Sequence, residues 1–291
     1  MPLVSIIIPV YNREELVSET IKSVISQSYS NIEIVIVDNC STDGTWAILE
    51  QFSNLDSRIK IYRNESNIGP VRNWKKCIEL ASGEYIKILF SDDLISFDYI
   101  NECVTKFDRD TGFVMSAIQP FREGVNHPLK TFKEFIYTRE EYLYEMIIQN
   151  KKGFPVSPGN AIFRKADIVQ SLLIDINNPW EWDFSIFGAG PDLLIMCITA
   201  SKYKYIKTTN NVISYFREHI NSISGEKTRG LRKYYEFSKV YFVNNYYNKL
   251  ENDLKTRYFF KQFSSTYDDA FYKETKGRFK INCIIKMLFH K

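Results

Sequence analysis

The sequence predicts an α/β fold in which a mostly parallel central sheet is flanked by helices and followed by a helical C-terminal extension. Strand and helix signals alternate through the first hundred residues, which is the pattern that βαβ units produce. From about residue 227 to the end, the chain contains no proline and its signals are helical. These two observations carry the prediction of the fold class.

Four strands are expected in the first hundred residues because four short apolar runs rich in β-branched side chains occur there. They cover residues 4–10, 32–37, 58–62 and 85–90. Three helices are expected between them. They cover residues 13–27, opened by Asn12 and Glu15 as a capping box, a short segment capped within 41–43, and residues 70–81.

The pattern is less regular after residue 100. Loop signals cluster over residues 150–165, an apolar helix is expected over 192–200, and a further strand over 203–207. We therefore expect one α/β domain over residues 1–224, made of two halves divided near residue 100. A helical extension rich in basic and aromatic residues is expected over 225–291.

Composition excludes several classes of protein. No run of about 18 apolar residues is present, so no membrane-spanning helix is expected. The N-terminus enters a strand pattern at once and leaves no room for a signal peptide. Five scattered cysteines, none spaced as CxxC, argue against a zinc site or a disulfide framework and favour a reducing compartment. A cytoplasmic protein is expected.

The C-terminal segment differs in charge from the rest of the chain. Residues 226–291 hold fifteen basic and seven acidic side chains, against 23 and 28 in residues 1–225. In residues 275–291 the apolar side chains fall on one helical face with basic residues nearby, which suits peripheral contact with an anionic membrane surface. Docking of that face onto the catalytic domain or a second subunit is the alternative. No nucleic-acid-binding motif is present.

Asp92 and Asp93 are the sharpest chemical signal, since they directly follow the fourth predicted strand. Ligands of open parallel sheets bind outside the carboxyl ends of the strands. Unpaired buried charge is costly, and adjacent carboxylates suit Mg²⁺ or Mn²⁺ bound together with substrate phosphates. The alternative is a capped turn that opens the following helix.

Two further positions are open to two interpretations each. Asp38 ends the second strand, where its carboxylate either accepts a hydrogen bond from a nucleobase or forms an Asx-turn. Arg72 stands near the start of a helix, where the helix dipole mildly disfavours a cation. An anionic ligand would explain that position, and an ordinary solvated arginine would equally fit it.

Five motifs occur in a fixed order, namely Val4–Asn12, Val35–Asp38 with Ser41–Thr45, Asn67–Asn73, Gly83–Ile86 and Ser91–Asp93. Together they resemble the family 2 glycosyltransferases of the GT-A fold. The resemblance is strong over about residues 3–100 and continues more weakly to about residue 224. It implies a cytoplasmic enzyme, peripheral on the inner face of the membrane, in polysaccharide or glycolipid assembly.

The resemblance also implies roles for single residues on the donor side. Pro9, Tyr11 and Glu14 would line the base and ribose pocket, and Asp38 would read the base, commonly uracil. Arg72 would lie near the base and the diphosphate. Asp92 would face the ribose and the sugar, and Asp93 would be the direct ligand of Mn²⁺ or Mg²⁺. The sequence departs from the family's Asp-x-Asp-Asp pattern in one place, because its first position is Phe90.

On the acceptor side, the resemblance implies a catalytic base that opens a helix about a hundred residues further on. Asp192 is the choice, with Glu181 and Asp183 as rivals. Asp192 is favoured because an apolar helix, a strand and then the segment Tyr215–Ser222 follow it. In that segment Arg217 and His219 would lie near the phosphates, and the loop at 159–160 would lie near the acceptor.

The implied reaction transfers a sugar, with inversion, from a nucleotide-diphosphate donor, a UDP-sugar being favoured. The acceptor would be a saccharide or a lipid-linked saccharide. A nucleotidyltransferase is disfavoured because no Gly-rich, Lys-bearing loop follows the first strand, and a dehydrogenase because GxGxxG is absent. A non-catalytic sugar-nucleotide-binding protein stays open because Phe90 replaces an acidic residue.

Overall fold

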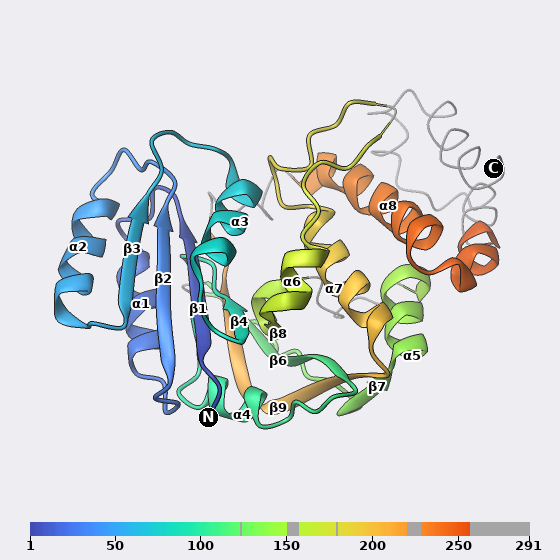
Figure 1. Ribbon diagram of the computed structural model, residues 1–291, viewed down its shortest axis with the longest axis horizontal. Coiled ribbons are helices and arrows are strands. Elements are labelled where there is room, and N and C mark those ends of the chain that lie inside the picture. The colour runs from blue at the N-terminus through green and yellow to red at the C-terminus, as the bar shows by residue number, and fades with distance from the viewer. Residues whose placement is uncertain (123, 150–156, 179, 220–227, 257–291) are drawn as a thin grey trace.

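The computed structural model describes residues 1–122, 124–149, 157–178, 180–219 and 228–256 (Figure 1). Within these ranges the chain forms a nine-stranded sheet with helices on both faces. The strands are β1 (Val4–Val10), β2 (Ile32–Asp38), β3 (Ile59–Arg63), β4 (Tyr85–Ile88), β5 (Leu94–Ile95), β6 (Thr111–Phe121), β7 (Ile136–Thr138), β8 (Ala161–Arg164) and β9 (Tyr205–Arg217).

The helices are α1 (Val17–Ile25), α2 (Thr45–Leu55), α3 (Pro70–Leu80), α4 (Tyr99–Val104), α5 (Arg139–Tyr144), α6 (Lys165–Ser171), α7 (Pro191–Lys202) and α8 (Thr228–Asn245). Three short helical segments are η1 (Glu145–Gln149), η2 (Pro158–Asn160) and η3 (Asn248–Leu250). Figure 1 places α2 and α8 at opposite ends of the longest axis of the molecule.

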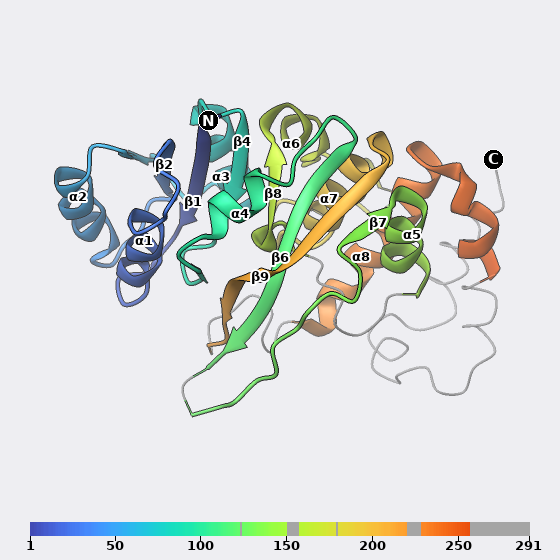
Figure 2. The same ribbon diagram turned by 90° about the horizontal axis from the view of Figure 1, so that it is seen from below.

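The sheet has a parallel half and a mixed half. Its strand order is β3-β2-β1-β4-β8-β6-β9-β5, with β7 paired to β9. The first four strands are all parallel. Beyond them β8 is antiparallel to β4 and β6, while β6 and β9 run parallel and side by side over their length (Figure 2). The predicted α/β fold is confirmed, and its parallel character comes from the first half.

Burial on both faces explains why β1 and β2 are continuous apolar runs. Every residue of these two strands is buried. One face packs against α1, α2 and α4, and the other face packs against α3, α6, α7 and α8. Strands covered on both sides have no solvent face for polar side chains to occupy, so the usual alternation is lost.

The predicted helix over residues 13–27 is wrong at its start, because α1 begins only at Val17 and the expected capping box does not form. Asn12 instead has a positive φ of 50°, and its side-chain oxygen accepts a hydrogen bond from the backbone N–H of Thr42 at 2.9 Å. Arg13 donates its backbone N–H to Thr45 Oγ1 at 2.8 Å. Contacts with the next loop therefore hold this segment out of the helix.

Two strand predictions need smaller corrections. The strand predicted over 85–90 ends at Ile88, so that residues 89–93 form a turn before the short β5. The strand predicted over 203–207 extends to Arg217, because its second part pairs with the distal part of β6 across a register shift. That extension carries Arg217 to the edge where Asp92 and Asp93 lie.

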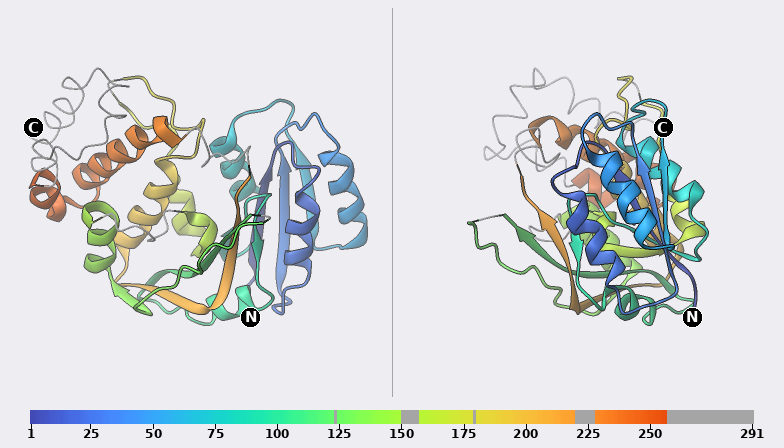
Figure 3. Two further views of the ribbon diagram at one scale, coloured as in Figure 1. Left: turned by 180° about the vertical axis from the view of Figure 1, so that it is seen from behind. Right: turned by 90° about the vertical axis from the view of Figure 1, so that its left-hand side faces the viewer.

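The helical extension is confirmed by α8, which packs on α7 and shares its hydrophobic core (Figure 3). Among the described residues, no helix has the length and apolar character needed to cross a membrane. The membrane-contact prediction for residues 275–291 lies outside the described residues and stays a prediction, as does the domain boundary at residue 224.

Candidate active site

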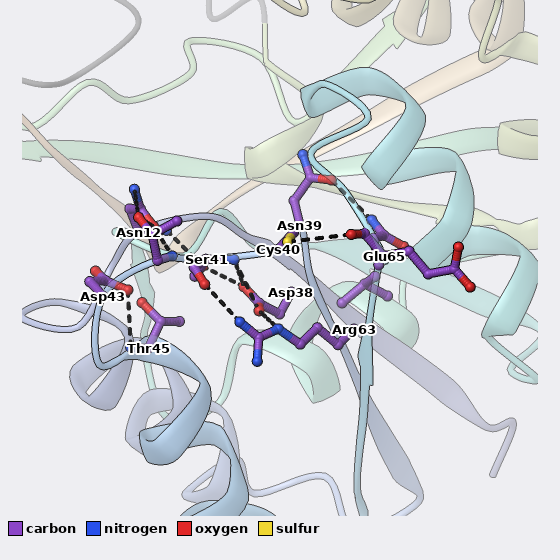
Figure 4. A network of polar contacts seen from close by, with 12 residues as sticks. Asn12, Asp38, Asn39, Cys40, Ser41, Asp43, Thr45, Arg63 and Glu65 are labelled. Carbon is purple, nitrogen blue, oxygen red and sulfur yellow. Dashed lines mark hydrogen bonds and ion pairs between the residues drawn. The ribbon is translucent and has the colours of Figure 1, made fainter.

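The loops that follow β1 and β2 are tied together by hydrogen bonds at the carboxyl edge of the sheet (Figure 4). The backbone N–H of Asn12 donates to Ser41 Oγ at 2.9 Å, and the N–H of Gly44 donates to Glu14 Oε2 at 2.6 Å. Tyr11 follows β1 directly with an exposed side chain, while Pro9 is buried within the strand opposite Val37. The expected base-pocket residues therefore share one corner of the molecule.

Asp38 is completely buried at the end of β2, and both of its carboxylate oxygens have partners. Ser41 donates its backbone N–H to Oδ1 at 3.1 Å and also donates its hydroxyl to that oxygen. Arg63 pairs with Oδ2 at 3.1 Å and donates to the carbonyl of Ser41 at 2.7 Å (Figure 4). These bonds hold the carboxylate in one orientation, and both sequence interpretations of Asp38 stay predictions.

Asp92 and Asp93 gather the residues that the sequence placed near the phosphates. His219 Nε2 lies 2.9 Å from Asp92 Oδ2. Arg217 donates its backbone N–H to Asp93 Oδ1 at 2.9 Å and its Nε–H to the backbone carbonyl of Asp92 at 3.0 Å. Its guanidinium also pairs with Glu19 and lies over the ring of Phe121. The end of β9 and the residues just after it thus bring an arginine and a histidine to the acidic pair.

Burial and then the neighbouring Asp92 charge raise the pKa of Asp93 well above its usual range. A bound divalent cation would offset both effects, since the two carboxylates and the donor's phosphates are the oxygen ligands that Mg²⁺ and Mn²⁺ take. Among the described residues, no group of three or more His, Cys, Asp or Glu side chains forms a metal site by itself. Asp92 and Asp93 are carboxylates of the kind that would fit a cation bound also by phosphate oxygens.

Arg13 also belongs to this corner, although the sequence analysis did not select it. Its Nε lies 3.6 Å from Asp92 Oδ2, and its Nη1 donates to the carbonyl of Asn12 at 2.9 Å. The Nε atom is buried and has no hydrogen-bond partner among the residues that the structure describes. The only signal in the sequence was a cation three residues after a buried strand, a position that a solvated arginine also commonly occupies.

Phe90 makes apolar contacts where the family pattern carries an acidic residue. Its ring lies 5.3 Å, centroid to centroid, from that of Trp74 on α3. It also approaches Gly159 so closely that a Cβ there would lie 3.0 Å from the ring, while Trp74 packs just as closely on Gly188. Phe90 therefore links the turn over residues 89–93 to the loop before α7 through packing.

Lys87 on β4 is a second residue that the sequence did not reveal. It is fully buried, and burial lowers its pKa to about 7. Its Nζ donates to Tyr99 Oη at 3.1 Å and to the carbonyl of Gly159. Its charge also acts to lower the pKa of Asp93. These contacts of Lys87 could not be predicted from the apolar strand in which it stands, because its partners come from distant segments.

Asp192 lies at the first turn of α7 with only 9% of its surface exposed. Oδ1 accepts hydrogen bonds from the backbone N–H groups of Gly190 and Leu193, at 2.9 and 2.7 Å. Oδ2 accepts one from the hydroxyl of Tyr235 on α8 at 2.6 Å. Burial raises the pKa of Asp192 to about 7, which these hydrogen bonds partly oppose.

The two rivals of Asp192 have other surroundings. Glu181 is exposed on a loop, with a positive φ of 56°. Asp183 accepts hydrogen bonds from the backbone and hydroxyl of Ser185, and these lower its pKa. Arg72 donates to the Ser185 hydroxyl and lies 3.8 Å from Asp183, so its contacts are with this loop of the second half.

Comparison with known proteins shows the family of this chain. The model of the family described as "Glycosyl transferase family 2" matches residues 5–170, which is more than half of the chain. The chain belongs to glycosyl transferase family 2. The matched region contains β1 to β4 with Asp38, Asp92 and Asp93, and it ends before Asp192.

Curated relatives agree with the family assignment. WfaP of Escherichia coli, named UDP-Glc:alpha-D-GlcNAc-diphosphoundecaprenol beta-1,3-glucosyltransferase, is 43% identical over 79% of this chain and 83% of its own. TuaG of Bacillus subtilis, named as a glycosyltransferase of teichuronic acid biosynthesis, is 45% identical over 51% of this chain and 58% of its own. Two Haemophilus influenzae glycosyltransferases are matched over 34% and 41% of their lengths. The chain thus spans less than two thirds of several relatives.

Solved structures share the fold. Staphylococcus aureus TarS, residues 1–349 in complex with UDP-GlcNAc, superposes with a TM-score of 0.66 at 20% identity, covering 98% of this chain and 79% of that one. The mannosyltransferase PcManGT of Pyrobaculum calidifontis, in complex with GDP-Man and Mn²⁺, gives a TM-score of 0.53 at 17% identity over 99% and 73% of the two chains. At these identities the likeness concerns the fold alone.

Proposed function

We propose that this chain is a metal-dependent, inverting glycosyltransferase that moves a sugar from a UDP-sugar to a hydroxyl of a saccharide or lipid-linked acceptor. One observation carries the proposal. Asp92 and Asp93 meet Arg13, Arg217 and His219 at the carboxyl edge of the parallel strands. The names of WfaP and TuaG support a role in polysaccharide or glycolipid assembly.

The donor base and ribose would bind over the loops after β1 and β2. Tyr11 offers an exposed aromatic side chain there, and Asp38 is held in one orientation by Ser41 and Arg63. Glu14 ties the two loops together through Gly44, and Pro9 shapes the end of β1. A pocket held in advance by such bonds binds its ligand with less loss of conformational freedom.

The diphosphate would lie at the acidic pair. Arg217 and His219 contact Asp92, so both side chains would lie beside the diphosphate, and the guanidinium of Arg217 would offset charge that develops on the leaving nucleoside diphosphate. A divalent cation held at Asp93 would supply Lewis-acid stabilisation of the same oxygens when bound. The Arg217 backbone N–H holds the Asp93 carboxylate in a fixed orientation for that role.

Asp192 would be the catalytic base. A general base works best when its pKa lies near the operating pH, and burial raises the pKa of Asp192 to about 7. It would take the proton from the acceptor hydroxyl while that oxygen attacks the anomeric carbon from the side opposite the leaving group. One such displacement inverts the configuration, so an α-linked donor would yield a β-glycoside.

Calorimetric titration of UDP, GDP, dTDP and CDP, each with and without Mn²⁺, tests the donor site directly. We expect UDP to bind tightly only with Mn²⁺, and we expect Asp93→Ala to abolish that dependence. Asp175→Ala, which removes an exposed carboxylate from a surface loop, is the matched control and should bind as the wild type does. Failure of all four nucleotides to bind would refute the donor-site assignment.

Phe90 favours one second candidate, a sugar-nucleotide-binding protein without catalysis. Its packing on Trp74 and Gly159 fills with an apolar ring a position that is acidic in the family pattern. The two functions differ in turnover. Release of UDP from UDP-glucose or UDP-GlcNAc that depends on a saccharide or lipid-linked acceptor would exclude the binding protein, and tight binding without such release would favour it.

A further inference from the structure

Helix α8 packs directly over the start of α7, where Asp192 lies. Gly190, with a φ of 99°, approaches α8 so closely that a Cβ at this position would lie 2.5 Å from Ser238 Oγ. Tyr234 and Phe237 of the same helix pack their rings on Phe184, with centroids 5.1 and 5.5 Å away. These contacts fix α8 against the loop that leads into Asp192.

The hydrogen bonds of Asp192 divide unequally between its two oxygens. Oδ1 takes two backbone donors close in sequence, from Gly190 just before α7 and from Leu193 in its first turn. Oδ2 takes a single donor, Tyr235, which comes from another helix 43 residues away. An ionised carboxylate has about four acceptor positions. The described residues therefore leave one acceptor position of the Asp192 carboxylate unoccupied, on Oδ2. The bond from Tyr235 determines the direction in which that position points.

The charged and titratable surroundings of Asp192 come mainly from α8. Tyr235 bonds to it, and Lys239 and Glu236, both buried, form an ion pair at 3.9 Å near Cys197 of α7. Cys197 itself lies close enough to Asp192 for the Asp192 charge to raise its pKa, and Tyr142 of α5 lies near Cys197. Among the hydrogen bonds that lower the pKa of Asp192, the one from Tyr235 contributes most.

We propose that Tyr235 is a positioning residue for the catalytic base, so that α8 completes the acceptor side of the active site. The inference rests on the proposed role of Asp192. Tyr235 orients the Oδ2 atom, leaves one of its lone pairs for the acceptor hydroxyl and stabilises the ionised form. The region matched by the family model ends at residue 170, so this part of the site lies beyond it.

Tyr235→Phe tests the inference, because it keeps the packed ring and removes only the hydroxyl. A hydrogen bond to a charged group is worth enough to shift a pKa by about one unit. We expect the acid limb of the kcat/KM profile to move up by about one pH unit. At pH 6 the variant should be about tenfold slower than the wild type, and near pH 9 the two should converge, with the donor KM unchanged.

Tyr234→Phe is the matched control, since it removes the neighbouring hydroxyl on the same helix and should leave the profile in place. A second measurement needs no turnover. The carboxyl ¹³C signal of Asp192, identified by its absence in Asp192→Asn, should titrate near pH 7 in the wild type and about one unit higher in Tyr235→Phe.

Two results would count against these assignments and are distinguishable. If Tyr235→Phe leaves both the profile and the carboxyl titration where the wild type has them, Tyr235 is only a packing residue. If Asp192→Asn transfers sugar as fast as the wild type, Asp192 is not the base and the proposed mechanism fails. The carboxyl titration still reports the Tyr235 bond in that second case.

Discussion

The two halves of the molecule position their functional side chains in different ways. In the parallel half, Asp38 ends β2, Asp92 and Asp93 lie in the turn after β4, and their partners lie on neighbouring loops or on the end of β9. In the second half, Asp192 opens α7, and α8 contacts both its side chain and the glycine before it. The first arrangement follows from strand order, whereas the second depends on helix packing between segments far apart in the chain.

This contrast suggests that the two halves contribute to different steps of the reaction. The strand-end residues would govern donor binding, because all of them lie at the edge where parallel sheets bind ligands. The α7–α8 pair would govern the chemical step, because it holds the buried carboxylate whose pKa lies near neutrality. Variants of the two halves should therefore affect different kinetic constants.

Asp192→Asn should give the largest effect on the rate of the reaction. It should also distinguish most clearly between the roles of the two halves. Loss of a general base lowers kcat by about 10²- to 10⁴-fold, while binding of UDP with Mn²⁺ should stay within twofold of the wild type. Steady-state kinetics and calorimetry measure the two quantities. Asp183→Asn, on the neighbouring loop, is the control and should retain most activity. An equal loss in both variants would contradict the choice of Asp192.

The pH dependence of the reaction also tests the role of the second half. Asp192 must be ionised to accept a proton, so with a pKa of about 7 the rate should rise with pH and level off above that value. Below pH 6 the rate should fall about tenfold per unit. Profiles of kcat/KM from pH 5.5 to 8.5 measure this limb. A flat profile across pH 7 would mean that another group takes the proton.

Arg13→Gln tests the donor half and should act on binding. Its buried Nε has no hydrogen-bond partner among the described residues and lies 3.6 Å from Asp92, so we expect a donor phosphate or hydroxyl to contact this guanidinium. Loss of one charge-assisted bond should weaken UDP binding by about tenfold and leave kcat within about threefold. Arg58→Gln, whose partner is Asp56, is the control. Unchanged affinity would assign Arg13 a structural role.

Gly190→Ala tests the contact between α8 and the loop before α7 through the stability of the fold. A positive φ and the clash with Ser238 should lower the free energy of unfolding by about 1–3 kcal/mol. Gly230→Ala in α8 is the control, because its Cβ would meet nothing within 4 Å and alanine favours the helix by about 1 kcal/mol. Urea unfolding measures the stability of both variants. Equal stability of the two would show that α8 does not pack closely against Gly190.

The sequence by itself determined the parallel half and the residues at its strand ends. Buried parallel strands require continuous apolar runs, and such runs can be recognised without knowledge of their partners. The residue that follows such a run lies at the ligand-binding edge whatever the rest of the chain does. Asp38, Asp92 and Asp93 could be selected for this reason.

Only the tertiary structure decided the contacts between distant segments. The bond from Tyr235 to Asp192, the place of Arg13 beside Asp92 and the burial of Lys87 all depend on how loops and helices pack. None of these side chains stands in a pattern that differs from an ordinary surface or core residue. Their surroundings depend on burial and on partners up to 79 residues away, which local sequence patterns do not encode.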